Sequence, residues 1–202
     1  MTITLVRHGE TAWSRSGRHT GTTDLGLTEA GRDQARRLRP KLAERCFPMV
    51  LCSPLRRARE TCEEAGFGDR AVLCDELREW DYGDYEGLTT AEIRTRDPGW
   101  DLWRDGCPGG ERPGQVGARV DRMLALVPSV KHVLIFAHGH VLRVMAARWV
   151  QLEPGAGARF ALGAGAVSVL GHERETRVVQ GWNATGGDDL FAGDALPGRA
   201  PA

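Results

Sequence analysis

The chain has 202 residues, and its 27 lysines and arginines are balanced by 27 aspartates and glutamates, so the formal net charge is zero. This balance argues against a protein that holds nucleic acid or an anionic membrane by bulk attraction. Length and a 41% hydrophobic, 27% charged composition suit one water-soluble domain. No apolar run approaches the roughly 20 residues of a membrane span. The five scattered cysteines indicate neither a disulfide framework nor a zinc site, so we expect a cytoplasmic protein.

The first half of the chain predicts short strands that alternate with helices. Residues 2–6 are rich in β-branched side chains and predict a strand, which is followed by a polar, glycine-rich loop at 9–26. Thr28 is typical of a helix N-cap, and the apolar positions after it predict a helix that Pro48 ends. The next expected elements are a strand at 49–52, a helix at 55–65 and a strand at 71–74.

The second half continues this alternation. It predicts an acidic loop at 75–87, a helix at 89–96, a loop at 100–114, a helix at 116–127, a buried strand at 132–137, a helix at 141–150, and strands at 166–170 and 177–179. We expect an α/β fold in three layers, with a mainly parallel central sheet and helices on both faces. Residues 1–183 form the single domain in this interpretation, and 184–202 are expected to be a flexible tail.

Charged and polar side chains follow the predicted strands at the points where they end. Arg7 and His8 follow the first strand, Arg57 comes shortly after the second, Glu79 after the third, and His138 after the fourth. In α/β folds, ligands collect outside the carboxyl ends of the strands. The sequence therefore brings histidines, arginines and a glutamate to one edge of the sheet, and these are the groups that phosphoryl transfer needs.

Each of these side chains suits one part of that chemistry. A neutral His8 can attack phosphorus to form a phosphohistidine. Arg7 and Arg57 can fork onto the phosphate oxygens, and a protonated His138 can add a third donor. Glu79 is placed to protonate the departing alkoxide and then to activate water. Three other acidic residues of the same loop compete with it for this role: Glu76, Asp81 and Glu86.

Residues 5–11 (LVRHGET) resemble the Arg-His-Gly signature of the histidine phosphatase superfamily, the clan that includes cofactor-dependent phosphoglycerate mutases. Further blocks follow in the family's order at 27–31 (LTEAG), 53–61 (SPLRRARET), 77–87 (LREWDYGDYEG) and 137–140 (AHGH). The resemblance implies a phosphoglycerate mutase-like fold and a phosphorylated His8. It also implies a phosphate pocket of Arg7, Arg57 and His138, and Glu79 as the proton donor. No metal and no organic cofactor is implied.

Two further segments, 13–21 (WSRSGRHTG) and 103–107 (WRDGC), are similar to a sub-branch of sedoheptulose-1,7-bisphosphatases and broad-range acid phosphatases. This similarity adds Ser14 to the phosphate site and Thr20 and Gly21 to the substrate site, and the superfamily block at 137–140 adds Gly139 to the phosphate site. Three residues remain open between binding a second phosphate or sugar hydroxyl and lying in solvent: Arg18, His19 and Arg104. His140 is expected at the pocket rim rather than in a metal site with His138.

These observations predict a metal-independent phosphatase that acts on small phosphorylated metabolites, with sugar phosphates as the expected substrates. The short segment between Gly87 and Gly109 favours hydrolysis over transfer, because a shorter lid shields a phosphoenzyme less from water. Two alternatives stay open: a mutase that returns the phosphoryl group to a sugar acid, and a non-catalytic protein that binds phosphorylated ligands. A homodimer is a further open alternative.

Overall fold

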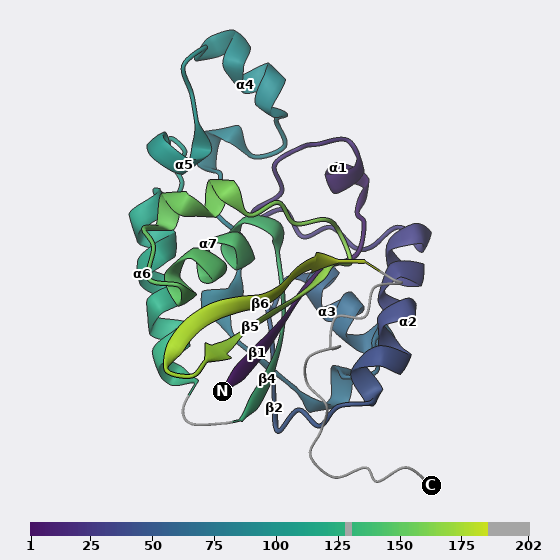
Figure 1. The fold of residues 1–202 in the computed structure, drawn as a ribbon. Helices are drawn as coiled ribbons and strands as arrows, with labels where there is room; N and C mark the ends of the chain where they lie inside the picture. The colour runs from purple at the N-terminus through teal and green to yellow at the C-terminus, as the bar shows by residue number, and fades with distance from the viewer. Residues whose placement is uncertain (128–130, 186–202) are drawn as a thin grey trace, which may run out of the picture.

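A six-stranded mixed sheet crosses the protein in the computed structural model, which describes residues 1–127 and 131–185 (Figure 1). The strands are β1 (Thr2–Arg7), β2 (Met49–Cys52), β3 (Ala71–Leu73), β4 (His132–Ala137), β5 (Val167–Glu173) and β6 (Thr176–Ala184). The α-helices are α1 (Ala12–Arg15), α2 (Glu29–Ala43), α3 (Arg56–Glu64), α4 (Thr90–Arg96), α5 (Leu102–Asp105), α6 (Pro113–Leu126) and α7 (Gly139–Trp149). Short 3₁₀ turns are η1 (Gly68–Arg70), η2 (Asp75–Leu77), η3 (Gly83–Tyr85) and η4 (Pro154–Arg159).

The sheet has the strand order β3-β2-β4-β1-β5-β6. The first four of these strands are parallel; β5 pairs antiparallel with β1, and β6 pairs antiparallel with β5. Strand β4 pairs with β1 on one side and β2 on the other, and it is covered on both faces. This central position explains its unbroken apolar sequence, because a strand buried on both faces needs no polar alternation. The expected, mainly parallel sheet is confirmed.

Helices cover both faces of the sheet. Figure 1 shows α2 and α3 on one face and α6 and α7 on the other. Successive side chains of β4 point to opposite faces. Phe136 accordingly belongs to the core beneath α2 and α3, whereas Ile135 belongs to the core that includes Val120 of α6 and Met145 of α7. The three layers of the sequence-based prediction are therefore present.

Several element boundaries differ from those predicted. Helix α2 ends at Ala43 rather than near Pro48, because the chain must leave the helix to bury Phe47 against the ring of Phe67, 5.9 Å away. The loops expected at 9–26 and 100–114 contain the four-residue helices α1 and α5. Strand β6 extends to Ala184, one residue beyond the predicted end of the domain. The rest of the predicted flexible tail, apart from Thr185, lies outside the described residues.

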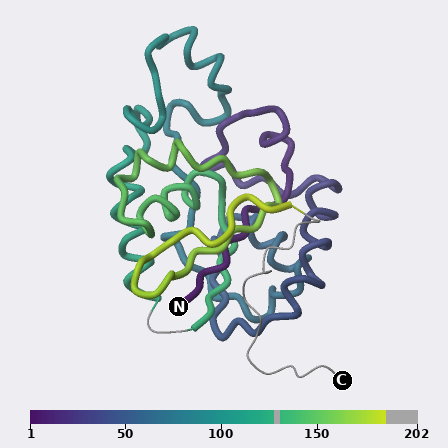
Figure 2. Tube along the Cα trace, viewed as in Figure 1, coloured from purple at the N-terminus to yellow at the C-terminus, as the bar shows by residue number. Residues whose placement is uncertain are grey.

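Two segments that are distant in sequence meet beyond the carboxyl ends of β1 and β4. The backbone of His19 pairs with the segment that precedes α4. The His19 N–H donates to Leu88 O, and the Gly87 N–H donates to the His19 carbonyl, both at 2.9 Å. Arg18 and Thr89 also form an isolated bridge. Figure 2 shows the loop after β1 beside the segment that leads into α4. Among the described residues, no helix is long and apolar enough to cross a bilayer.

Candidate active site

A cavity of about 260 Å³ opens where β1 and β4 end. Its wall is drawn from five parts of the chain: the end of β1 with the loop after it, the acidic loop near Glu79, the start of α4, the first half of α7 and the segment before β5. The residues that line it are Arg7, His8, Ser14, Gly17, Arg18, His19, Thr20, Glu79, Tyr82, Thr90, Gly139, His140, Arg143 and Leu162. The predicted edge of the sheet thus carries a cavity, and most of the predicted side chains reach it.

His8 lines this cavity, and one of its two ring nitrogens has no hydrogen-bond partner among the described residues. Its Nδ1 lies 2.7 Å from the carbonyl oxygen of Gly9, and because a carbonyl only accepts, the ring proton sits on Nδ1. The lone pair is therefore on Nε2. Burial, reinforced by the positive charges of Arg57 and Arg7, lowers the pKa of His8 well below its ordinary range. The imidazole is neutral, which is the form that can act as a nucleophile.

Arg7 holds an unused donor beside His8. One of its terminal nitrogens donates to the carbonyl of Leu162. Its Nε is the buried side-chain nitrogen that has no hydrogen-bond partner within the described part of the chain. A buried donor left unpaired is costly, so this N–H is suited to an anion that enters the cavity. Gly139, the first residue of α7, leaves space for the guanidinium: a Cβ there would lie 3.3 Å from Arg7 Cζ.

Arg57 and His138 form a layer behind the cavity wall, since both are fully buried and neither lines the cavity. The Arg57 Nε–H donates to His138 Nδ1 at 3.0 Å. Its terminal nitrogens donate to the carbonyls of Thr20, Gly21 and Thr23 at 2.9 to 3.1 Å. Most of the N–H groups of Arg57 are thus engaged within the protein. The predicted two-pronged contact with phosphate requires some of these bonds to be exchanged when the ligand binds.

His138 is a neutral imidazole in this site, contrary to the protonated form expected from the sequence. The Arg57 N–H can only donate, so His138 Nδ1 accepts and the proton lies on Nε2, 2.7 Å from the hydroxyl oxygen of Ser53. Burial, with the nearby charge of Arg57, lowers the pKa of His138 well below its ordinary range. Its ring centroid is 5.2 Å from that of His8, which places the two predicted histidines side by side.

Glu79 is the carboxylate among the described residues that line the cavity. Its two oxygens accept backbone N–H bonds from Trp80, His140 and Val141, at 2.9 to 3.0 Å. Two of these donors belong to the first turn of α7, where amide groups without a helical partner favour a negative charge. The competing carboxylates are bound elsewhere: Glu76 by Arg122, Asp81 by Gly83 N–H, and Glu86 by the N–H groups of Gly21 and Thr23.

The other predicted phosphate and substrate residues divide into two groups. Ser14 lines the cavity, but its hydroxyl already donates to Thr11 O and accepts from Thr11 N–H in the cap of α1. Arg18 also lines the cavity, although its guanidinium is bound to Glu92 and to Gly87 O. His19, Thr20 and His140 lie in the wall as well.

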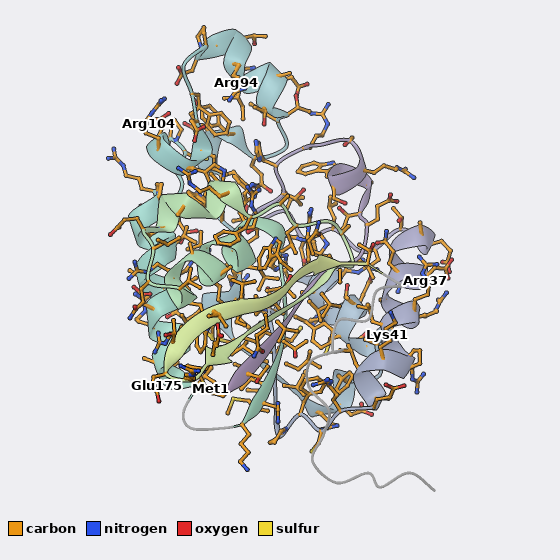
Figure 3. All side chains as sticks on the ribbon, in the orientation of Figure 1. Met1, Arg37, Lys41, Arg94, Arg104 and Glu175 are labelled. Atoms are coloured by element: carbon orange, nitrogen blue, oxygen red, sulfur yellow. The ribbon has the colours of Figure 1, made fainter. Side chains whose placement is uncertain are left out.

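Gly21 and Arg104 do not reach the cavity. Gly21 lies behind the wall, where its carbonyl accepts from Arg57. Arg104, a residue of α5, is exposed and paired with Asp105 at the periphery of the molecule (Figure 3). Gly21 is expected in the substrate site from the sequence but lies behind the wall, because its carbonyl serves the Arg57 layer. Of the two alternatives left open for Arg104, the structure shows the solvent-exposed one.

The prediction missed several residues of the wall, and Arg143 is the most notable. Arg143 stacks over Trp103, with its Cζ 4.4 Å from the ring centroid, and donates to the carbonyls of Gly157 and Ala158. Its spacing of three residues from His140 on α7 was the available signal, since such residues share a helix face. Tyr82, Thr90, Leu162 and Gly17 also line the cavity. Within the described ranges, no group of three or more histidine, cysteine, aspartate or glutamate residues is arranged to hold a metal ion.

Comparison with known proteins agrees with this geometry. The family model described as "Histidine phosphatase superfamily (branch 1)" matches residues 3–185. The chain belongs to this superfamily. An acid phosphatase of Mycobacterium tuberculosis is 44% identical over 189 residues, which cover 91% of this chain and 93% of that protein. This histidine phosphatase also resembles the sedoheptulose 1,7-bisphosphatase of Saccharomyces cerevisiae, with 38% identity over 181 residues, 73% of this chain and 67% of the relative.

A solved structure gives the same result for the fold. The vanadate-containing structure of mycobacterial glucosyl-3-phosphoglycerate phosphatase superposes on this histidine phosphatase with a TM-score of 0.81 and 30% identity, covering 91% of this chain and 99% of the other. The family, the α/β fold and the phosphatase class expected from the sequence are confirmed.

Proposed function

We propose that this histidine phosphatase hydrolyses small phosphorylated metabolites, sugar phosphates above all, through a phosphohistidine on His8. The observation that carries the proposal is the neutral His8, whose free Nε2 faces a cavity that also holds an unpaired Arg7 donor and the carboxylate of Glu79. Nucleophile, anion donor and proton carrier then lie in one wall, as phosphoryl transfer requires.

In the first step, Nε2 of His8 forms a bond to phosphorus while the bond from phosphorus to the ester oxygen breaks. Arg7 neutralises the oxygens of the transferred group, and the start of α7 adds the positive end of its dipole. Arg57 and His138 support the group from behind. Glu79, which enters this step as the carboxylic acid, gives its proton to the departing oxygen, so the alcohol leaves uncharged and Glu79 becomes a carboxylate.

In the second step, water attacks the phosphorus of phospho-His8. Glu79, now ionised, takes a proton from that water, and the nitrogen–phosphorus bond breaks to release inorganic phosphate. His8 returns to its neutral state, with the proton on Nδ1 still donated to Gly9 O. The cycle needs neither a metal nor an organic cofactor. We also propose a cytoplasmic location, which the five unpaired cysteines support.

The proposed preference for sugar phosphates draws on the relatives named above, whose names refer to sedoheptulose 1,7-bisphosphate and glucosyl-3-phosphoglycerate. The cavity wall is consistent with such ligands, because it combines polar side chains such as Thr20 and Thr90 with the rings of His19 and Tyr82. Polar groups of this kind can bind hydroxyls while the rings pack against a carbon skeleton.

The deciding experiment replaces His8 by Asn, because the Asn amide can still donate to Gly9 O but has no nucleophilic ring nitrogen. His8→Asn is expected to fold, to lose turnover of a panel of sugar phosphates by at least about 1,000-fold, and to form no phosphoenzyme. The wild type should form one that acid destroys and base preserves. His132→Gln is the matched control, since His132 lies at the other end of β4. Retained turnover in His8→Asn would overturn the proposal.

The mutase alternative is separated by supplying 3-phosphoglycerate together with 2,3-bisphosphoglycerate. Phosphate release without formation of 2-phosphoglycerate supports hydrolysis, whereas isomerisation that outpaces phosphate release would favour the mutase. Vanadate should inhibit the hydrolysis, and a chelator should not. Binding of phosphorylated sugars without any turnover would favour the non-catalytic alternative.

A further inference from the structure

One side of the cavity is lined by three rings that have no part in the proposed transfer steps. His19, Tyr82 and His140 lie close together, with ring centroids 4.8 Å apart for His19 and Tyr82 and 5.8 Å apart for Tyr82 and His140. Burial lowers the pKa of both histidines and raises the pKa of Tyr82. This wall is therefore polar but uncharged, unlike the part of the cavity near Arg7.

The hydrogen bond between Tyr82 and His140 fixes where the imidazole proton lies. The Tyr82 hydroxyl is 2.5 Å from Nδ1 of His140. Tyr82 is 1% exposed, and within the described residues its hydroxyl meets no other acceptor, so its proton must point at Nδ1 to avoid being buried without a partner. His140 Nδ1 then accepts, and the ring carries its proton on Nε2.

The Nε2–H of His140 is an available donor. No described residue accepts from it, and the side chain of His140 is 23% exposed and lines the cavity. The backbone N–H of His140 donates to Glu79 Oε2 at 3.0 Å, and Nδ1 is 3.8 Å from the same oxygen. The free donor therefore belongs to a residue that is anchored directly on the proposed proton donor, next to the place where the ester oxygen must lie.

We propose that the Nε2–H of His140 binds a hydroxyl oxygen of the leaving group, and that the Tyr82 hydroxyl is the positioning residue that keeps the proton on Nε2. The substrates selected are phosphomonoesters of polyols and sugars that carry a hydroxyl close to the scissile bond. This inference rests on the proposed function. A site built to bond a substrate hydroxyl discriminates strongly against an analogue that lacks it, because its buried polar group is then left unpaired.

Two esters with similar leaving groups test the inference: glycerol 3-phosphate, whose alcohol carries two further hydroxyls, and propyl phosphate, whose alcohol carries none. The measured quantity is the ratio of their kcat/KM values. The wild type is expected to prefer glycerol 3-phosphate by about tenfold or more. His140→Asn keeps an acceptor for Tyr82 but removes the Nε2 donor, and it should lower this ratio by about tenfold. His132→Gln should leave the ratio unchanged.

Tyr82→Phe keeps the imidazole of His140 but removes the hydroxyl that holds its proton on Nε2, so the ring can take either tautomer. The same ratio should fall by a smaller factor, about threefold, and the double variant should show the same ratio as His140→Asn alone. It also keeps the inference falsifiable if His140→Asn does not fold. A ratio that neither variant changes, or a wild type without preference, would overturn the role of His140 while leaving the phosphatase intact. A wild type that hydrolyses no phosphomonoester would instead contradict the proposed function, and this inference with it.

Discussion

The Nε–H of Arg57 lies 3.0 Å from Nδ1 of His138, and this one contact decides the state of the imidazole. Because a guanidinium only donates, His138 must accept on Nδ1 and carry its proton on Nε2, toward Ser53. The same guanidinium holds three carbonyls of the loop 20–23. Arg57 therefore couples the tautomer of His138 to the position of a loop that forms part of the cavity wall.

Arg57→Lys should lower kcat/KM by about 100-fold, or about 2.7 kcal/mol. A lysine keeps the charge, but a single ammonium group cannot bond His138 and also the carbonyls of Thr20, Gly21 and Thr23. Steady-state kinetics on a sugar phosphate measure the effect. Arg104→Lys serves as the matched control, since Arg104 is exposed and does not reach the cavity, and it should change kcat/KM by less than about twofold. An Arg57→Lys enzyme as active as the wild type would contradict this coupling.

Ser53→Ala tests the other side of the same imidazole. The substitution removes the acceptor for the Nε2–H of His138, a group that is fully buried. Leaving such a donor unpaired should reduce the free energy of unfolding by about 1–3 kcal/mol, as measured by urea denaturation. Ser16→Ala is the comparison, because Ser16 is exposed and its hydroxyl donates to the carbonyls of Ala12 and Trp13 in the adjoining short helix. Equal stability of both variants would argue against the assigned tautomer.

Much of the site could be predicted because strand ends in a parallel sheet meet at one edge. Arg7 ends β1, and His8 and His138 directly follow β1 and β4, which are neighbours. The register of the two strands brings Arg7 opposite Ala137, the residue before His138. Glu79 reaches the same edge from the loop after β3, where the first turn of α7 holds its carboxylate. These placements depend on topology, which alternating strands and helices reveal in a sequence.

The remaining features depend on contacts that sequence patterns do not carry. Arg104 sits on a four-residue helix, too short for periodicity to show which way its side chain points. Arg143 reaches the cavity only because it stacks on Trp103 and bonds η4. The neutral state of His138 follows from partners that lie 81 and 85 residues away in the chain. The direction of Arg104, the stacking of Arg143 and the protonation state of His138 could therefore be determined only from the structure.

The buried histidines should make stability fall in mild acid. The pKa of His8 in the folded protein lies well below its ordinary value of 6.5. Below about pH 6.5, His8 therefore binds a proton in the unfolded chain but not in the folded one. Stability is fully present above that pH and decreases toward the folded-state pKa, by at most about 1.4 kcal/mol per pH unit for each such histidine. His8→Asn should show a shallower decrease of the unfolding free energy between about pH 6 and pH 5. A slope equal to that of the wild type would mean that His8 is protonated in the folded state.

The loop that carries His8 is packed against the first turn of α2 without any side chain between them. A Cβ on Gly9 would lie 2.3 Å from the carbonyl oxygen of Gly31, and a Cβ on Gly31 would lie 2.2 Å from that of Glu10. The Gly9 N–H also donates to the Thr61 hydroxyl at 3.0 Å. Both partners of the clash are backbone, so an added methyl group can be accommodated only if the loop and the helix move apart.

Gly9→Ala is therefore expected to reduce the free energy of unfolding by about 1–3 kcal/mol, the usual cost of overpacking, and to lower kcat/KM because the adjacent His8 moves with the loop. Gly114→Ala is the matched control: Gly114 lies in the first turn of α6, and beyond its own turn no described atom comes within 4 Å of an added Cβ. That variant should be unchanged or more stable by up to about 1 kcal/mol, since alanine favours the helix. Chemical denaturation and steady-state kinetics on both proteins measure the difference. If Gly9→Ala were as stable and as active as Gly114→Ala, the close approach of this loop to α2 would have no part in positioning the nucleophile.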